Sequence, residues 1–329
     1  MQLARRRWLA GAGSVAAVLL LAVAGRWYEH RAEAADARRF PPPGRFVAVG
    51  ARRLHVVCIG AGAPAVLFEP SGFGNALSFS EAREALARRT RVCSYDRAGS
   101  GWSDPAGDPL SVGTLADDAL ALLDAVLPGA RVIVVASSVG GFTAELLARR
   151  HPERVAALVF LDAGNSRLLA EVDQRAPWAT LRVACAAGPA AARLGLIRLA
   201  DPFGIEPSRS EERARSAALT YRPGAWDTLC AMVRGYPRTR EAFAQAPPQR
   251  REIPVVALSA EYRTGLGPPW LDSSVAWMQP VMRVSHQELA SRSAAGRWRI
   301  VPGSSHLIAG SSPQAVIDAV QELLLLNPR

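Results

Sequence analysis

Short runs of apolar, β-branched residues alternate with longer segments of helical periodicity over most of the chain. Eight of these runs have the length, composition and flanking turn residues that are typical of strands. They are residues 46–50, 54–59, 65–68, 91–95, 131–136, 155–161, 253–258 and 297–301. Helical spacing separates several of them, most clearly over 112–126, 142–150 and 313–325. The alternation predicts an α/β fold with a mostly parallel central sheet flanked by helices.

Two stretches interrupt this alternation and indicate how the chain divides. Residues 166–251 carry helical patterns but no strand pattern, so we expect a helical cap inserted into the core. Residues 28–45 are charged and then proline-rich, which is typical of a short linker. The predicted organisation is a hydrophobic segment over 1–27, the linker, a core in two parts over 46–165 and 252–329, and the cap between those parts.

The N-terminal segment is uncharged from Trp8 to Gly25 and follows three arginines, Arg5 to Arg7. An apolar run of this length just reaches that of a transmembrane helix, and basic residues before such a helix favour a cytoplasmic start. We therefore expect a single-pass membrane anchor with an extracytoplasmic domain behind it. A signal peptide cleaved after Ala22-Val23-Ala24 and a twin-arginine signal are the alternatives.

Composition and charge exclude several classes of protein. The 329 residues are 49% hydrophobic and 21% charged, which excludes a disordered or fibrous chain. The formal net charge is +10, but the arginines that carry the positive charge are spread along the whole sequence. Because nucleic-acid binding needs a patch or stripe of such residues, we expect no nucleic-acid partner.

The four cysteines contain no CxxC pair and no histidine at zinc-finger spacing, so we expect no structural metal. Cys58 and Cys93 lie in predicted buried strands, where a free cysteine behaves as a small apolar side chain. Cys185 and Cys230 form a disulfide only if the fold brings them together, and their spacing leaves that open.

Ser138 lies in the turn between the apolar strand 131–136 and the helix that follows it. Gly140 and Gly141 come directly afterwards, and a sharp strand-to-helix turn requires such small residues. The turn lifts one hydroxyl above the end of the sheet, and the N–H groups at the helix start can stabilise an oxyanion beside it. Ser138 is therefore a candidate nucleophile, and the alternative is a structural serine.

A serine nucleophile needs a base and a carboxylate behind it. Among the five histidines, His306 lies in a loop at the carboxyl end of a predicted strand, where ligands collect in parallel sheets. Asp162 ends the strand that follows the Ser138 helix and is the candidate acid, which would fix the imidazole tautomer. Glu261 and Asp272, after strand 253–258, are the alternatives, and each keeps the chain order Ser, acid, His.

Four segments together resemble the α/β-hydrolase superfamily. They are residues 44–55, Tyr95-Asp96-Arg97-Ala98-Gly99-Ser100-Gly101-Trp102-Ser103, the turn at Ser138, and Gly303-Ser304-Ser305-His306. The second segment is typical of the alpha/beta-hydrolase-1 type, where it forms mainly a structural turn. The resemblance runs from about Pro43 to the C-terminus and implies the α/β-hydrolase fold. It also implies that Ser138 is the nucleophile and His306 the base, with the amides of Phe73 and Val139 as the oxyanion hole.

Two departures from the family pattern leave alternatives open. Ala136 and Ser137 stand where glycine and histidine are usual, and the customary acid after strand 253–258 is missing. An acid after the earlier strand, as in pancreatic lipases, matches Asp162. A catalytically inactive binding protein of the same fold therefore remains an alternative to an enzyme.

With the N-terminal segment, the resemblance implies a membrane-anchored serine hydrolase. Such an enzyme cleaves a carboxylic ester or related acyl bond through a Ser-Asp-His triad, without a cofactor or metal. Trp178 and Trp226 are candidate contacts for a small apolar ester-like substrate, or else residues that pack the cap. An aminopeptidase, a thioesterase or a cofactor-free haloperoxidase would use the same triad. The sequence does not indicate the oligomeric state.

Overall fold

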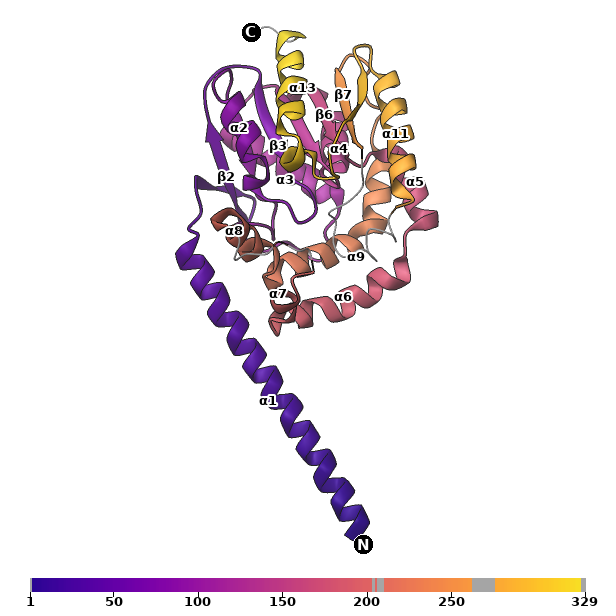
Figure 1. Cartoon of the computed structure of the whole chain (residues 1–329). Helices are drawn as coiled ribbons and strands as arrows, with labels where there is room; N and C mark the ends of the chain where they lie inside the picture. Colours follow the sequence, from indigo (N-terminus) through magenta and orange to yellow (C-terminus); the bar gives the residue numbers. More distant parts are fainter. Residues whose placement is uncertain (1, 203–204, 206–209, 262–275, 327–329) are drawn as a thin grey trace.

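A mostly parallel sheet forms the centre of the molecule (Figure 1). The computed structural model describes residues 2–202, 205, 210–261 and 276–326, with side chains from residue 13 onward, and its strand order is β1-β2-β4-β3-β5-β6-β7-β8. The strands are β1 Arg45–Val49, β2 Arg52–Ile59, β3 Ala65–Glu69, β4 Val92–Tyr95, β5 Val132–Ser137, β6 Val155–Leu161, β7 Val255–Ala260 and β8 Arg297–Val301. β2 runs antiparallel to both of its neighbours, and all other pairs are parallel. The predicted α/β fold with a mostly parallel sheet is confirmed.

Helices cover both faces of the sheet because the central strands are apolar on both sides. Val134 of β5 packs in the cluster that contains α3 and α4, whereas Val135 packs in the cluster that contains α2 and α13, and both side chains are buried. Alternate residues of a strand point to opposite faces, so a continuous apolar run such as β5 requires cover on each. The core helices are α2 Ser80–Leu86, α3 Val112–Val126, α4 Gly140–Arg150, α11 Met278–Arg292, α12 Ile308–Ser311 and α13 Pro313–Leu326, with short 3-10 turns η1 Ala76–Phe79 and η2 Pro152–Arg154.

A set of helices, here called the inserted helices, lies between β6 and β7 in the chain. They are α5 Ser166–Arg175, α6 Trp178–Arg193, α7 Leu196–Ala200, α8 Glu211–Thr220 and α9 Pro223–Gln245. Figure 1 shows them gathered along one end of the sheet. They occupy the segment for which the sequence predicts a cap, and the division of the chain into core, cap and linker stays a prediction.

Both pairs of cysteines form disulfides. Cys185 of α6 is joined to Cys230 of α9, which settles the pairing that spacing left open. Cys58 of β2 lies opposite Cys93 of β4 in the antiparallel register, with 4.1 Å between their Cα atoms, and these two are also joined. The expectation that Cys58 and Cys93 are free apolar side chains is wrong, because the residues facing each other across two strands depend on a register that the sequence does not give.

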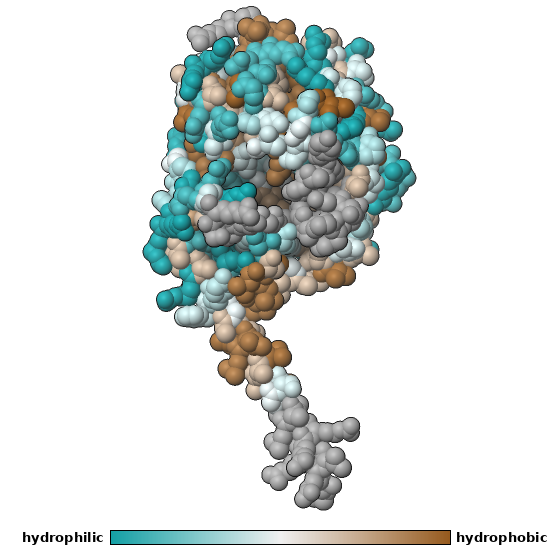
Figure 2. All heavy atoms as spheres, viewed as in Figure 1, coloured by the Kyte–Doolittle hydropathy of each residue, from teal (hydrophilic) through white to brown (hydrophobic). Residues whose placement is uncertain are grey.

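The helix α1 (Gln2–Arg39) leaves the body of the molecule, and its second half is held by the inserted helices (Figure 1). Arg198 of α7 forms ion pairs with Glu29 at 2.9 Å and with Asp36 at 2.8 Å. Further toward the N-terminus the apolar side chains of α1 are exposed, among them Leu20 and Leu21, at 71% and 72%. Figure 2 shows them as a brown surface outside the body.

The predicted membrane anchor is wrong, and so is the single-pass, extracytoplasmic placement that depends on it. In the part of the chain that the structure describes, no helix is long and apolar enough to cross a membrane. The uncharged part of α1 gives way to Arg26 and Glu29 within the same helix, which continues with charged residues to Arg39. The side chains of residues 1–12 lie outside the described part.

Candidate active site

The turn between β5 and α4 holds Ser138 in a conformation that few residues adopt. β5 ends at Ser137, α4 begins at Gly140, and Ser138 has a left-handed backbone with φ of 53°. Two bonds to the next strand fix it: its N–H donates to the Leu161 carbonyl at 3.3 Å, and its carbonyl accepts from the Gly164 N–H at 2.8 Å. Strained backbone that neighbours hold in place is typical of functional sites. Ser137 is 3% exposed in the strand, whereas Ser138 is less deeply buried.

Close packing explains the two glycines that follow this serine. A Cβ added at Gly140 would lie 2.5 Å from the carbonyl oxygen of Pro70, and one at Gly141 would overlap the carbonyl oxygen of Gly164, next to Ala163. Real side chains do not approach backbone atoms this closely, so α4 can begin here only with glycine. The sharp turn predicted from the small residues around Ser138 is therefore required by the packing of α4 against the ends of β3 and β6.

The imidazole of His306 joins Ser138 to Asp162. His306 lies in the loop after β8, with Nε2 2.9 Å from Ser138 Oγ and Nδ1 2.6 Å from Asp162 Oδ2. The ring and the carboxylate are each 1% exposed. Because a carboxylate can only accept, Nδ1 carries the proton toward Asp162, which leaves Nε2 to accept from the Ser138 hydroxyl.

The two carboxylates proposed as the acid have different partners. Asp162, which follows β6 with a φ of 42°, contacts the ring, and its other oxygen accepts from the Ala260 N–H at 3.2 Å. Glu261 instead accepts from the Gly303 N–H at 2.6 Å, in the loop that leads to His306. The structure thus places Asp162 against the imidazole of His306, and Glu261 against the backbone of the loop that contains His306. Asp272 lies outside the described residues.

Phe73 and Val139, whose amides are predicted to form the oxyanion hole, belong to two segments that are in contact. Phe73 belongs to the loop after β3, where the Gly74 N–H donates to the Ser71 carbonyl at 3.1 Å and closes a turn. A Cβ at Gly72 would lie 3.8 Å from Cγ1 of Val139, so the loop packs directly on the start of α4. The loop that contains Phe73 therefore lies beside Val139 at the start of α4. The first N–H groups of a helix have no partner within it.

The two tryptophans predicted to contact substrate have different surroundings. The ring of Trp226 lies 5.6 Å from that of Phe73, centroid to centroid, and also packs against Gly188 of α6. Trp178 packs on Tyr236 of α9, with their ring centroids 4.6 Å apart. Trp226 thus connects the inserted helices to the Phe73 loop, whereas Trp178 has its ring contact within the inserted helices.

Sequence reasoning missed a second serine and histidine pair next to this site. His286 of α11 is fully buried, with Nδ1 2.8 Å from Ser259 Oγ and Nε2 2.8 Å from the carbonyl of Ala163, the residue after Asp162. Burial lowers the pKa of His286, which favours the neutral ring. His286 lies in a polar helical stretch of the sequence, and only the packing of α11 against β7 shows that its ring is buried.

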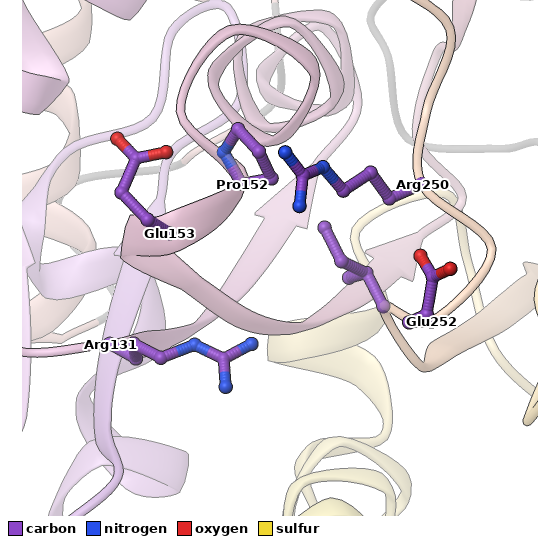
Figure 3. A pocket seen from close by; sticks show the side chains of 6 residues that line it. Arg131, Pro152, Glu153, Arg250 and Glu252 are labelled. Carbon is purple, nitrogen blue, oxygen red and sulfur yellow. The ribbon is translucent and has the colours of Figure 1, made fainter.

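A cavity of about 250 Å³ lies at the opposite end of the sheet, where β5 and β6 begin. Arg131 and Arg250 reach toward it from different sides (Figure 3). Glu153 and Glu252 also line it, so its charges are mixed and point to no particular ligand. Among the described residues, no group of three or more histidine, cysteine, aspartate or glutamate side chains could hold a metal ion.

Known proteins share both the sequence pattern and the fold. A family described as having the alpha/beta hydrolase fold matches residues 64–219. A 2-hydroxymuconate semialdehyde hydrolase of Pseudomonas sp. (strain CF600) is 30% identical over 223 residues, which make up 65% of this chain and 74% of that protein. An uncharacterized protein of Schizosaccharomyces pombe is 39% identical over 98 residues, 29% of this chain, and the match spans only 18% of that protein's length.

The solved structures agree. The enol-lactonase from Burkholderia xenovorans LB400 superposes with a TM-score of 0.58 at 20% sequence identity, over 85% of this chain and 100% of the lactonase. Identity this low shows the fold alone, because one fold serves many reactions. The sheet order, the strained serine turn and the similarity to the Pseudomonas hydrolase lead to one conclusion: the chain is a hydrolase that belongs to the α/β-hydrolase superfamily.

Proposed function

We propose that this hydrolase cleaves a carboxylic ester or a related acyl bond through a covalent acyl-enzyme on Ser138. The observation that carries the proposal is the continuous chain of hydrogen bonds from Ser138 Oγ through the His306 ring to Asp162, at 2.9 Å and 2.6 Å. A hydroxyl, an imidazole and a buried carboxylate in this order are what activation of a serine requires.

In the first half of the reaction, Ser138 Oγ attacks the substrate carbonyl carbon while its proton passes to His306 Nε2. The carbonyl oxygen becomes an oxyanion, for which the N–H groups of Phe73 and Val139 are the proposed donors. Asp162 stabilises the imidazolium that has formed. The bond to the leaving alcohol then breaks, and that alcohol takes the proton from His306.

In the second half, a water molecule attacks the acyl-enzyme. His306 takes a proton from the water, a second oxyanion forms in the same place, and its collapse releases the carboxylic acid. The proton on His306 returns to Ser138 Oγ. Each step needs only the three side chains and the backbone donors, so the proposal includes no metal or cofactor.

The aromatic pair of Phe73 and Trp226 supports an apolar acyl or alcohol group in the substrate. The ring of Phe73, on the loop that carries a proposed oxyanion donor, lies 5.6 Å from the ring of Trp226 in α9, centroid to centroid. Aromatic side chains beside a few directed polar groups are typical of small-molecule sites. Trp226→Ala should therefore change the preference among esters of different acyl length, and a change in thermal stability alone would favour a packing role.

The test is labelling of the purified full-length chain with a fluorophosphonate probe, together with hydrolysis of p-nitrophenyl butyrate. Ser138→Ala should lose labelling and lower turnover by about 10,000-fold or more. Ser137→Ala is the matched control, because that serine is adjacent but buried in β5. It should keep both activities.

The outcomes separate the enzyme from the binding protein. Loss of labelling in Ser138→Ala alone supports an activated nucleophile at that position. A folded wild-type chain that neither reacts with the probe nor hydrolyses any ester contradicts the proposal and favours an inactive binding protein of this fold.

A further inference from the structure

A buried charged cluster lies directly beneath the proposed oxyanion hole. Glu69 is the last residue of β3, Tyr95 is the last residue of β4, and Arg97 follows two residues later. Each is 2% exposed or less. The Tyr95 hydroxyl donates to the Glu69 carboxylate, and Arg97 Nη1 lies 3.6 Å from Glu69 Oε1. The proposed reaction uses none of these three side chains.

Arg97 fixes the turn that carries Phe73. Its Nη2 donates to the carbonyl of Ser71, which also accepts the Gly74 N–H at 3.1 Å. That second bond closes a four-residue turn in which Phe73 is the third member. The guanidinium therefore holds the first peptide of the turn, and the direction of the Phe73 N–H depends on where that peptide lies.

Glu69 and Pro70 contact the start of α4, the segment that carries the second proposed oxyanion donor. A Cβ at Gly140 would lie 2.9 Å from Cγ of Glu69 and 2.5 Å from the Pro70 carbonyl oxygen, so the first residue of α4 rests on this part of β3. Val139 directly precedes Gly140, and its side chain packs on Gly72. One cluster thus touches both segments that carry proposed oxyanion donors.

We propose that Arg97, paired with Glu69, is a positioning residue that sets the distance between the Phe73 and Val139 amides. The inference rests on the proposed function, since it concerns the oxyanion of the same reaction. A buried arginine without its carboxylate is strongly unfavourable, so the ion pair keeps the guanidinium on the Ser71 carbonyl. Donors aimed at the developing oxyanion act in the transition state and not on the bound substrate.

The test compares Arg97 with a matched arginine elsewhere in the sheet. Arg154 is also buried, at 9% exposed against 2% for Arg97, and donates to the carbonyls of Ala130 and Leu127. It pairs with the exposed Asp124 at the opposite end of the strands. Arg97→Gln should lower kcat for p-nitrophenyl butyrate by about 100- to 1,000-fold with KM changed less than threefold. Arg154→Gln should leave kcat within about twofold while lowering the melting temperature.

Two milder variants and a second readout keep the inference testable if Arg97→Gln does not fold. Arg97→Lys keeps the charge opposite Glu69 and should recover part of the lost kcat. Tyr95→Phe removes one bond to Glu69 and should lower kcat by about tenfold. In every variant, affinity for a butyl boronic acid, which forms a tetrahedral anion on a serine, should fall in parallel with kcat.

The failure of this inference differs from the failure of the proposed function. Wild-type turnover that depends on Ser138, with Arg97→Lys and Tyr95→Phe both within twofold in kcat, overturns the positioning role alone. A rise in KM with unchanged kcat also overturns it, because that pattern reports ground-state binding. Absence of Ser138-dependent turnover in the wild type overturns both.

Discussion

Two buried histidines in this protein each bind a buried aspartate, and what lies on the far side of each ring separates them. His306 Nδ1 lies 2.6 Å from Asp162, and His55 Nδ1 lies 2.8 Å from Asp96. The other nitrogen of His306 faces the Ser138 hydroxyl, whereas that of His55 faces the Pro43 carbonyl. A hydroxyl can give up a proton and a carbonyl has none. The first pair can therefore move a proton, and the second can only hold the chain.

The aspartates differ in the same way. Asp96 also accepts from the backbone N–H groups of Ala76 at 2.6 Å and Trp102 at 2.8 Å, so it ties three segments together. The carboxylate of Asp162 accepts from the Ala260 N–H and contacts the His306 ring, whose other nitrogen faces Ser138. The turn that contains Asp96 is accordingly a structural element, as its resemblance to the family implied. A histidine and aspartate pair gains a chemical role only from its third partner.

Substitution of the two histidines tests this comparison with the largest expected effect. His306→Gln should lower kcat for p-nitrophenyl butyrate by about 10,000-fold, because the base is lost. His55→Gln should leave kcat of the folded enzyme within about tenfold, but lower the free energy of unfolding by about 3 kcal/mol, because Asp96 loses a buried partner. Urea denaturation and steady-state kinetics on both variants give the two quantities. Equal loss of activity in folded protein would contradict the distinction.

Substitution of the carboxylates gives the next largest effect and separates the two candidate acids. Asp162→Asn should lower kcat by about 1,000- to 10,000-fold, because an amide facing Nδ1 favours the wrong tautomer. Glu261→Gln should change kcat by less than about tenfold, since Glu261 binds the Gly303 N–H and not the ring. The control variant Asp96→Asn should lower stability more than activity. A larger kcat loss in Glu261→Gln than in Asp162→Asn would reverse the assignment.

A third buried carboxyl extends the comparison to the free energy of unfolding. Burial raises the pKa of Glu69 from 4.5 to about 7, against the opposing effects of Arg97 and the Tyr95 hydrogen bond. Between these values the folded chain holds a proton that the unfolded chain has lost, so stability falls as pH rises from about 4.5 to 7, by about 3 kcal/mol from this group. Denaturation of Glu69→Gln should show a flatter slope in that window. The same slope in the wild type and in Glu69→Gln would contradict this contribution of Glu69 to the pH dependence of stability.

The sequence predicted the elements better than their contacts. The run over 131–136 and the small residues after it predicted a strand and a sharp turn, and the structure has β5 and the turn at Ser138 there. The turn needs Gly140 because only glycine fits against the carbonyl of Pro70. Local pattern is enough for this, since the requirement is local. The order Ser, acid, His left Asp162, Glu261 and Asp272 open, because the choice depends on which strand end faces the ring.

The missed features all depend on contacts between distant segments. The pairing of Cys58 with Cys93 needs the strand register, and the burial of His286 needs the position of α11. The N-terminal prediction failed for a different reason. The apolar run predicts an anchor from its own length and flanking charges, but it is part of a longer helix that continues past Arg26 to Glu29, which pairs with Arg198.

The position of His306 after β8 links the proposed catalysis to an edge of the sheet. Ser138 follows a central strand, whereas β8 is last in the sheet order, and only one of its five side chains is buried. Terminal strands with few buried contacts open at a lower free energy than the strands between them. In the language of hydrogen exchange, the amides of β8 should exchange before those of β5. Mild heat or denaturant should then abolish activity reversibly while the circular dichroism of the protein is still native. Loss of activity would therefore measure the local opening of β8 and not global unfolding.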